Sequence, residues 1–187
     1  MSDPESPSPN PGPLAASGAS GFGPERSLSV TWFDPQVSAR ALPTMSGLDF
    51  LQAIGRGDLP EPPIFRLLGI RPVTALQGRV EFVFTPDERH YNPIGSVHGG
   101  VFATLLDSVM GCAVHTALPA GVGYTTLELK TNILRPLGVD SGEVACVGTI
   151  IHVGARTATA EGRMHDARGK LVAHATTTCL ILRPDRT

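Results

Sequence analysis

One acidic residue, Asp107, interrupts the apolar stretch from Val101 to Ala117, which contains no other carboxylate. Burying a carboxylate costs several kcal/mol unless it is paired or hydrogen-bonded. Asp107 either faces a small polar gap and caps a nearby loop, or is held at a cleft to attack a substrate or to activate water. We favour the cleft, because unpaired buried acids are rare and tend to mark functional sites.

The segment His98–Gly100 begins the same stretch. Two adjacent glycines, Gly99 and Gly100, let a ligand approach the backbone closely. The first amides of a helix lack internal partners and carry partial positive charge, so they can stabilise an oxyanion. The alternative is that the glycines only permit close packing at a helix start. The pattern favours an oxyanion site.

The spacing of these two features bears on assembly. Gly99 and Asp107 are eight positions apart, which is about 12 Å along a helix. One chain therefore cannot easily bring both to one reacting carbon. Two antiparallel chains could place the helix start of one opposite Asp107 of the other, which predicts an active site across a dimer interface.

Asn92 and His98 are further candidates just before the predicted helix. The Asn92 amide could hold a carbonyl or a water, or Asn92 could simply form an Asn-Pro turn. His98 could be a base, a hydrogen-bond donor, or a structural group that ties the loop to the sheet, and we favour the last. No metal site is expected, because the other histidines lack ligand spacing: His90, His115, His152, His165 and His174.

The elements that must position these residues follow from hydrophobic patterning. The stretch from Gly99 to Ala117 predicts a helix that is apolar on nearly every face and must be buried all round. Strands are predicted before and after it, with Gly154 and Arg168-Gly169 at hairpins: 78–85, 124–134, 142–153, 155–166 and 170–182. The fold class is α+β, with a curved antiparallel sheet that wraps the central helix. The helix then needs no other element to cover it.

Three segments are expected along the chain. Residues 1–25 are rich in Ser, Pro and Gly and predict a disordered tail. Residues 26–63 predict a covering segment with a short helix near Met45–Ile54, capped by Ser46 or Thr44. Residues 64–183 form the main domain, which opens with a helical turn that Gly69 stops. Whether the covering segment closes a pocket mouth or only packs on the sheet is open.

Composition narrows the class of partner. The formal net charge is −2 and 17% of residues are charged, so we expect no nucleic-acid or anionic-membrane partner. No apolar run reaches the length of about 20 residues that a membrane helix needs, and the start of the chain has no secretory h-region. The three cysteines lack redox or zinc spacing and predict buried thiols in a reducing, cytoplasmic compartment.

The run Asn92–Gly100 (NPIGSVHGG), followed by Leu106-Asp107, resembles the PaaI-like hotdog acyl-CoA thioesterases. Their pattern is N-x-x-G-x-x-H-G-G with an acid seven residues after the last glycine, and every fixed position is matched here. The resemblance covers about residues 64–182 and includes four further segments: 124–130, 132–136, 152–157 and 173–178.

The resemblance implies a role for each matching residue. Asp107 would be the nucleophile or general base, the Gly99 amide would polarise the thioester carbonyl, and Asn92 would position that carbonyl or the water. Thr126 would place a hydroxyl near the acid, supplied with it by the opposite subunit. Relatives are homodimers or dimers of dimers (tetramers), and CoA belongs to the substrate, so no separate cofactor is expected.

The resemblance also implies that Arg135 and Arg156 lie near the CoA nucleotide and phosphates, where a guanidinium matches phosphate geometry. Their alternative is an ordinary solvated surface arginine. The acyl group is left open. Four residues lie near the predicted site and could line its acyl pocket: Phe102, Leu105, Val109 and Met110. Phe102 and Met110 are the two that we predict to bind the substrate.

The sequence therefore predicts an acyl-CoA thioesterase that acts through Asp107 opposite the Gly99 amide. Two alternatives stay open. One is a hotdog dehydratase of hydroxyacyl thioesters, which would pair a catalytic histidine with an acid. The other is a non-catalytic acyl-CoA binding module, although such a module has no need to bury the charge of Asp107.

Overall fold

The computed structural model of the protein describes residues 21–184. Most of the tail predicted over residues 1–25 lies outside the described residues. The elements follow one another in this order: α1 (Gln36–Ala39), α2 (Gly47–Arg56), α3 (Pro63–Leu68), β1 (Ile70–Leu76), β2 (Arg79–Phe84), η1 (Glu88–His90), α4 (Gly99–His115), β3 (Gly123–Ile133), η2 (Val139–Ser141), β4 (Val144–Val153), β5 (Thr157–His165) and β6 (Leu171–Leu182).

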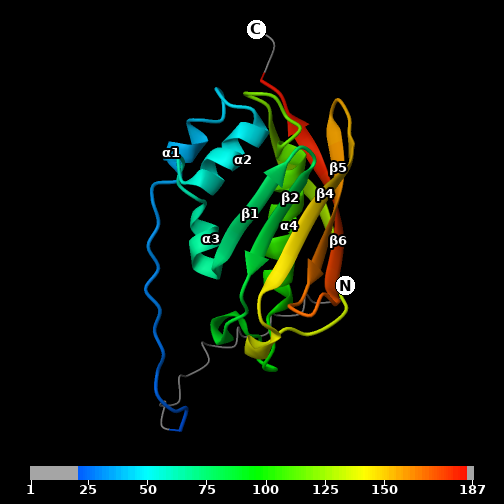
Figure 1. The fold of residues 1–187 in the computed structure, drawn as a ribbon. Helices are drawn as coiled ribbons and strands as arrows, with labels where there is room; N and C mark the ends of the chain where they lie inside the picture. The colour runs from blue at the N-terminus through cyan, green and yellow to red at the C-terminus, as the bar shows by residue number, and fades with distance from the viewer. Residues whose placement is uncertain (1–20, 185–187) are drawn as a thin grey trace, which may run out of the picture.

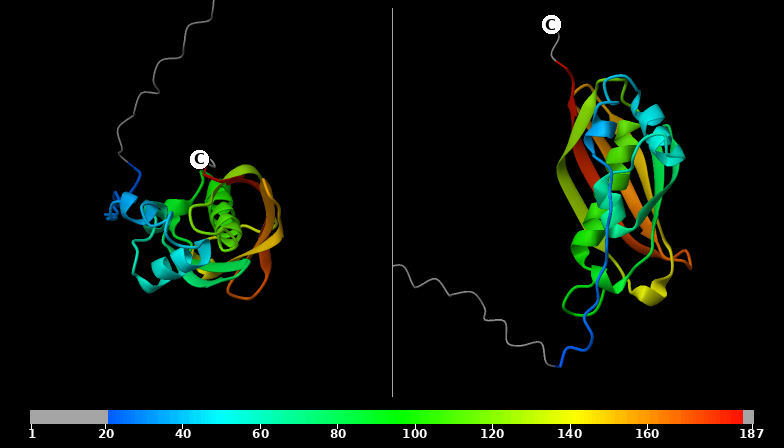
Figure 2. Two further views of the ribbon diagram at one scale, coloured as in Figure 1. Left: turned by 90° about the horizontal axis from the view of Figure 1, so that it is seen from above. Right: turned by 90° about the vertical axis from the view of Figure 1, so that its left-hand side faces the viewer.

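The strands form one six-stranded antiparallel sheet in the order β1-β2-β4-β5-β6-β3. Figure 1 shows the strands in front of and beside α4, and the view from above in Figure 2 shows the sheet curving around that helix. The predicted architecture, a curved antiparallel sheet around a long helix, is confirmed. The predicted hairpins at Gly154 and at Arg168-Gly169 join β4 to β5 and β5 to β6.

The sheet contains one strand that was not predicted. The first strand, β1, was not expected as a strand, and Pro72 and Val73 lie at a register shift against β2. A proline is tolerated there because β1 is an edge strand with one side unpaired. The strand that follows α4, β3, pairs with β6 at the other edge of the sheet, a pairing that the sequence analysis left open.

The core lies between α4 and the concave face of the sheet. Glycine permits the closest approach: a Cβ built on Gly148 of β4 would lie 2.3 Å from the carbonyl oxygen of Val109. Ten residues of α4 or its end are buried in or beside this core: Phe102, Leu105, Leu106, Val109, Met110, Gly111, Ala113, Val114, His115 and Thr116.

The expectation that α4 is buried all round is wrong for the single chain. Ala103, Thr104, Asp107 and Ser108 are only half-buried, and Gly100 is exposed. These residues follow one another at three- and four-residue spacing, so they form one stripe along the helix. Because they are small or polar, the stripe has little apolar surface to bury against the sheet. It leaves a face of α4 uncovered, and Asp107 lies on it.

The covering segment is helical where the pattern predicted it. Ser46 is the N-cap of α2, and its Oγ accepts a hydrogen bond from the amide of Asp49 at 3.2 Å. The second short helix, α3, ends at Gly69, whose φ of 71° is in the left-handed region that favours glycine. Both helices lie against β1 and cover the outer side of that edge (Figure 1).

Candidate active site

Asp107 has a hydrogen-bond partner on the neighbouring edge strand. The Thr126 hydroxyl donates to Asp107 Oδ1 at 2.8 Å, and both residues are half-buried. Thr126 faces α4 because alternate residues of β3 point to the helix side, and Thr125 and Leu127 are exposed. A hydroxyl donor stabilises the carboxylate and fixes its orientation. The second carboxylate oxygen remains available to a ligand.

The ring of His98 caps the start of α4. Its Nδ1 accepts a hydrogen bond from the Gly100 amide at 2.9 Å, while the His98 amide donates to the carbonyl of His90 at 2.7 Å. The His98 side chain thus fixes the helix start. The favoured prediction, that it ties the loop to the sheet, is wrong for the side chain. Because Nδ1 is an acceptor, the neutral ring carries its proton on Nε2.

The amide of Gly99 is the remaining donor at this helix start. Gly100 and Val101 donate to His98, but within residues 21–184 the Gly99 amide has no hydrogen-bond acceptor. Gly99 is the first residue of α4 and is half-buried. An unpaired amide at a helix N-terminus is a donor for a carbonyl oxygen that becomes negatively charged.

Asn92 is used by its own loop. Its Oδ1 accepts from the amides of Ile94 and Ser96 at 3.0 and 3.2 Å, and its Nδ2 donates to Ser96 Oγ at 3.2 Å. This is the turn arrangement considered as the alternative for Asn92. The loop nevertheless forms one wall of a shallow depression of about 260 Å³, whose other wall includes Gly99 and Arg135. One Nδ2 hydrogen of Asn92 is left for a ligand there.

Tyr124, which the sequence reasoning did not single out, lies beside the acid. It is two residues before Thr126 on the same face of β3, and its ring lies against Gly111, one helical turn after Asp107. A Cβ on Gly111 would come within 2.8 Å of the Tyr124 ring. The glycine inside an apolar helix was the available signal, because such a glycine often permits a close approach.

Burial controls the other titratable groups near Asp107. It raises the pKa of the Cys112 thiol to about 12, with a further contribution from the charge of Asp107. It also raises the pKa of Tyr124 well above its usual value and lowers that of His115. These three groups are therefore neutral at physiological pH. All three cysteines are free thiols.

The two predicted CoA-binding arginines lie far apart in one chain. Arg135 follows β3, and its amide and guanidinium bond to the carbonyls of Val172 and Leu171. Arg156 precedes β5 and bonds through its carbonyl to the amide of Ile181. Nine residues of β6 separate these contacts, about 30 Å along a strand. Both arginines are exposed, and one chain does not bring them together.

Phe102 and Met110 are parts of the core. Phe102 is 1% exposed and touches the floor of the depression beside Gly99. Met110 is fully buried, and its side chain packs toward Gly162 of β5. The structure therefore brings Phe102, but not Met110, to a cavity wall among the described residues.

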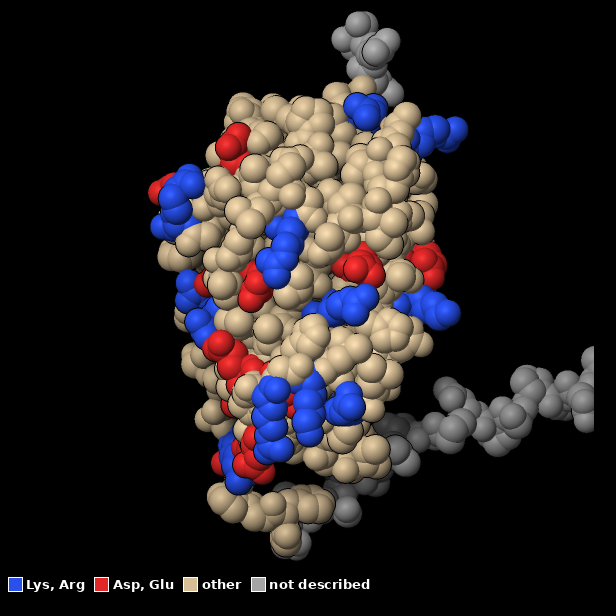
Figure 3. Space-filling model, turned by 45° about the vertical axis from the view of Figure 1, so that its right-hand side comes forward, with Lys and Arg blue, Asp and Glu red and all other residues tan. Residues whose placement is uncertain are grey.

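The outer surface carries charge of both signs. On the face in Figure 3, basic side chains lie beside acidic ones and are separated by broad uncharged areas. Pairs of this kind occur within single strands, such as Arg79 with Glu81 at 3.2 Å and Arg163 with Glu161 at 3.6 Å. In the described part of the chain, no helix is both long enough and apolar enough to cross a membrane.

Comparison with known proteins follows the same residues. The family model described as the thioesterase superfamily matches residues 94–173, which include Gly99, Asp107 and Thr126. A candidate esterase from Pseudomonas aeruginosa is 30% identical over 132 residues, 70% of this chain and 84% of that protein. A candidate esterase from Halobacterium salinarum is 38% identical over 69 residues, which are 36% of this chain and 44% of that protein.

Solved structures share the architecture. A thioesterase candidate from Ralstonia eutropha JMP134, related to phenylacetic acid degradation, is 29% identical with a TM-score of 0.64, covering 70% of this chain and 98% of that one. The PaaI protein of E. coli is 19% identical with a TM-score of 0.63 (77% and 99% covered). A Streptococcus mutans UA159 protein bound to acetyl CoA is 23% identical with a TM-score of 0.57 (63% and 91% covered). The last two likenesses concern the fold.

Proposed function

This chain belongs to the thioesterase superfamily and has its hotdog fold, and from that premise we propose that it hydrolyses acyl-CoA thioesters to a free acid and CoA. One observation carries the proposal: Asp107, oriented by Thr126 at 2.8 Å, lies on the uncovered face of a helix whose first amide has no partner. A positioned carboxylate and an oxyanion donor are the two groups that acyl transfer to water needs.

The chemistry has two balanced routes. In the first, Asp107 takes a proton from water, the hydroxide adds to the thioester carbonyl, and the carbon–sulfur bond breaks as CoA leaves and takes up the proton. In the second, the Asp107 carboxylate itself attacks and CoA leaves as the thiolate; water then attacks the Asp107 carbonyl carbon of the mixed anhydride, which releases the acid, restores the carboxylate and supplies the proton that the thiolate takes up. In both routes the Gly99 amide stabilises the oxyanion. Hydrolysis in ¹⁸O water under single-turnover conditions separates them, since only the second places carboxylate oxygen of the protein in the first product.

The site is proposed to form between two copies of the chain. Within residues 21–184 the β3 edge of the sheet is unpaired, and its exposed residues include Leu127 and Ile133, which are 58% and 46% exposed. An unpaired edge with apolar side chains favours pairing with another strand. Thr126 lies beside Asp107, whereas Ile133 lies 3.4 Å from a Cβ built on Gly99. Antiparallel pairing of two β3 strands about their middle would therefore set Gly99 of one copy opposite the partner's Asp107.

The same pairing supports a CoA site. In an antiparallel dimer the Arg135 end of one copy lies at the Arg156 end of the other, so the two guanidinium groups that one chain separates come to the same end of the assembly. The depression beside Gly99 and Arg135 would receive the thioester end of the ligand. The acetyl CoA bound to the Streptococcus mutans protein supports this ligand class. No metal or redox cofactor is needed for the reaction.

Release of CoA thiol from a panel of acyl-CoAs tests the activity. Replacing Asp107 by Asn keeps the size of the side chain and its bond to Thr126, but removes the base, so turnover should fall by about a thousandfold or more. The dimer and the unfolding midpoint should be unchanged. Undiminished hydrolysis by Asp107→Asn would contradict the proposed catalytic role of Asp107. If the native chain hydrolyses no thioester but binds one, the non-catalytic binding module would take its place.

Mixing two inactive variants tests the shared site. In a mixed dimer of Asp107→Asn with Gly99→Pro, one of the two sites has its native Gly99 amide and its native Asp107. Random exchange makes half of the dimers mixed, so the mixture should recover about a quarter of native activity. A mixture as inactive as its components would mean that each site lies within one chain.

A further inference from the structure

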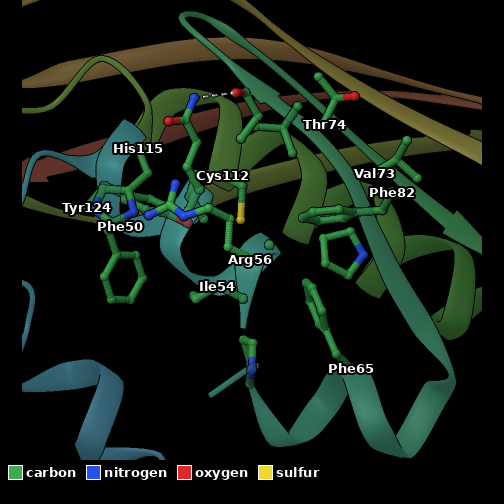
Figure 4. Close-up of a pocket in the computed structure, with 17 residues that line it drawn as sticks. Phe50, Ile54, Arg56, Phe65, Val73, Thr74, Phe82, Cys112, His115 and Tyr124 are labelled. Atoms are coloured by element: carbon green, nitrogen blue, oxygen red, sulfur yellow. Dashed lines mark hydrogen bonds between the residues drawn. The ribbon is translucent and has the colours of Figure 1, made fainter. Parts of the chain in front are cut away.

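A predominantly apolar cavity lies between the covering segment and the sheet. It encloses about 520 Å³, within the range of small-molecule sites. Figure 4 shows Phe50 and Ile54 of α2 facing Phe65, Phe82 and Val73 across it. The covering helix is thus one wall of a chamber rather than a lid packed flat on the strands.

The inner end of the chamber is lined by residues that neighbour the candidate active site. Cys112 of α4 and Tyr124 of β3 line its inner end. Tyr124 lies against Gly111, one turn of α4 beyond Asp107, and two residues from Thr126 on the same face of β3. One helical turn is about 5.4 Å. If the thioester carbonyl of a substrate lies at Asp107, the hydrocarbon part of its acyl group can therefore extend past the Cys112 thiol into the chamber.

We propose that this chamber, bounded by α2, β1, β2 and the inner end at Cys112 and Tyr124, holds the hydrocarbon part of the substrate's acyl group. The proposal rests on the proposed thioesterase function and names its substrate class: uncharged apolar acyl groups, medium-length aliphatic or arylalkyl, in preference to acetyl and to acyl groups that end in a carboxylate.

The polar groups of the chamber support that class. The Nε2 of Gln52 donates a hydrogen bond to the carbonyl of Ala75 at 3.1 Å, drawn as the dashed line in Figure 4. Arg56, which also lines the chamber, pairs with Asp58 at 2.8 Å. His115 is neutral because burial lowers its pKa. The chamber therefore offers no unpaired charge to a terminal carboxylate, and apart from Thr74 and Tyr124 most of its remaining lining is apolar.

Apolar walls make binding depend on chain length. Each buried methylene strengthens binding by up to about fourfold. An octanoyl group has six more methylenes than an acetyl group, and an acetyl group would end near Cys112 without entering the chamber. We therefore expect octanoyl-CoA to bind at least about tenfold more tightly than acetyl-CoA, which is well below the upper limit that full burial would give.

Calorimetric titration with acetyl-, octanoyl-, phenylacetyl- and succinyl-CoA tests the predicted preference. The titrations use the Asp107→Asn variant, and all further substitutions are made in it, because it does not hydrolyse the ligand. Ile54→Trp fills the chamber from α2 and should reduce the octanoyl-to-acetyl affinity ratio at least about tenfold. The matched control is Leu67→Trp, on α3 at a side chain that is 52% exposed and outside the chamber, and it should keep the native ratio.

A second filling variant guards against misfolding of the first. A Cβ on Gly55, which also lines the chamber, meets no atom within 4 Å, so Gly55→Leu can be accommodated and should lower the same ratio. Loss of the ratio in either folded variant supports the chamber. A native ratio near one, tight succinyl-CoA binding, or a ratio unchanged in both variants would overturn it. Binding that depends on Ile54 without turnover by the native chain would reject the hydrolysis alone.

Discussion

The Thr126 hydroxyl lies 2.8 Å from Asp107 Oδ1 and donates to it across the gap between β3 and α4. The edge strand therefore orients the carboxylate of the candidate site. Thr126→Val keeps the shape of the side chain but removes the donor, so kcat should fall about 10- to 100-fold as the carboxylate loses its fixed position. Thr125→Val, on the exposed face of β3, is the matched control. Equal rates for the two variants in a thiol-release assay would contradict the role of Thr126.

The Gly99 amide can be deleted without rebuilding the helix. Gly99 is the first residue of α4, where proline is well tolerated, and His98 before it already has the extended backbone (φ −62°, ψ 138°) that a following proline requires. Gly99→Pro removes the N–H, and kcat should fall by about 100-fold or more. Gly99→Ala keeps the N–H and should lose far less. Equal loss in the two would show that space, rather than the donor, matters at Gly99.

The close approach of β4 to α4 predicts opposite effects for two identical changes. A methyl group on Gly148 would lie 2.3 Å from the Val109 carbonyl oxygen, a backbone atom that cannot move alone. Gly148→Ala should therefore destabilise the fold by about 3 kcal/mol. Gly55→Ala, in α2 with nothing within 4 Å, should stabilise it by about 1 kcal/mol. Urea unfolding of both variants checks the sign, and similar midpoints would contradict the contact.

Buried His115 predicts how stability depends on pH. Burial lowers its pKa in the folded chain, so the unfolded chain binds the proton more readily, and the free energy of unfolding falls as pH drops through the unfolded value of about 6.5. His90 adds to this loss, since burial lowers its pKa too. His115→Gln should therefore lose less stability than the native chain between about pH 7.5 and pH 5.5. Parallel loss in urea titrations of the two proteins would contradict this.

The sequence was sufficient for elements with strong local patterns. The helix from Gly99, the hairpins at Gly154 and Gly169, and the Ser46 cap of α2 are each encoded by neighbouring residues, so they could be predicted. The strand β1 could not, because Pro72 breaks its pattern and is tolerated only at a sheet edge, which no local pattern reveals.

Contacts between residues that are distant in the sequence were harder to predict. The expectation that Thr126 lies near Asp107 came from a family resemblance, since no spacing rule joins a strand residue to a helix residue 19 positions away. The ring of Tyr124 against Gly111 and the chamber under α2 depend on how three layers pack. The polar stripe on α4 was visible in the sequence, but Thr104 and Ser108 are weak signals beside the long apolar runs that surround them.

The chamber under α2 separates two properties by their place in the chain. The groups proposed for bond breaking lie on α4 and β3, whereas most of the chamber wall comes from residues before residue 83. Substitutions in α2 can therefore alter which acyl group fits while the catalytic residues stay untouched. Chains that share the central motif but differ in this helix can diverge in substrate range over evolution, with the hydrolytic step conserved.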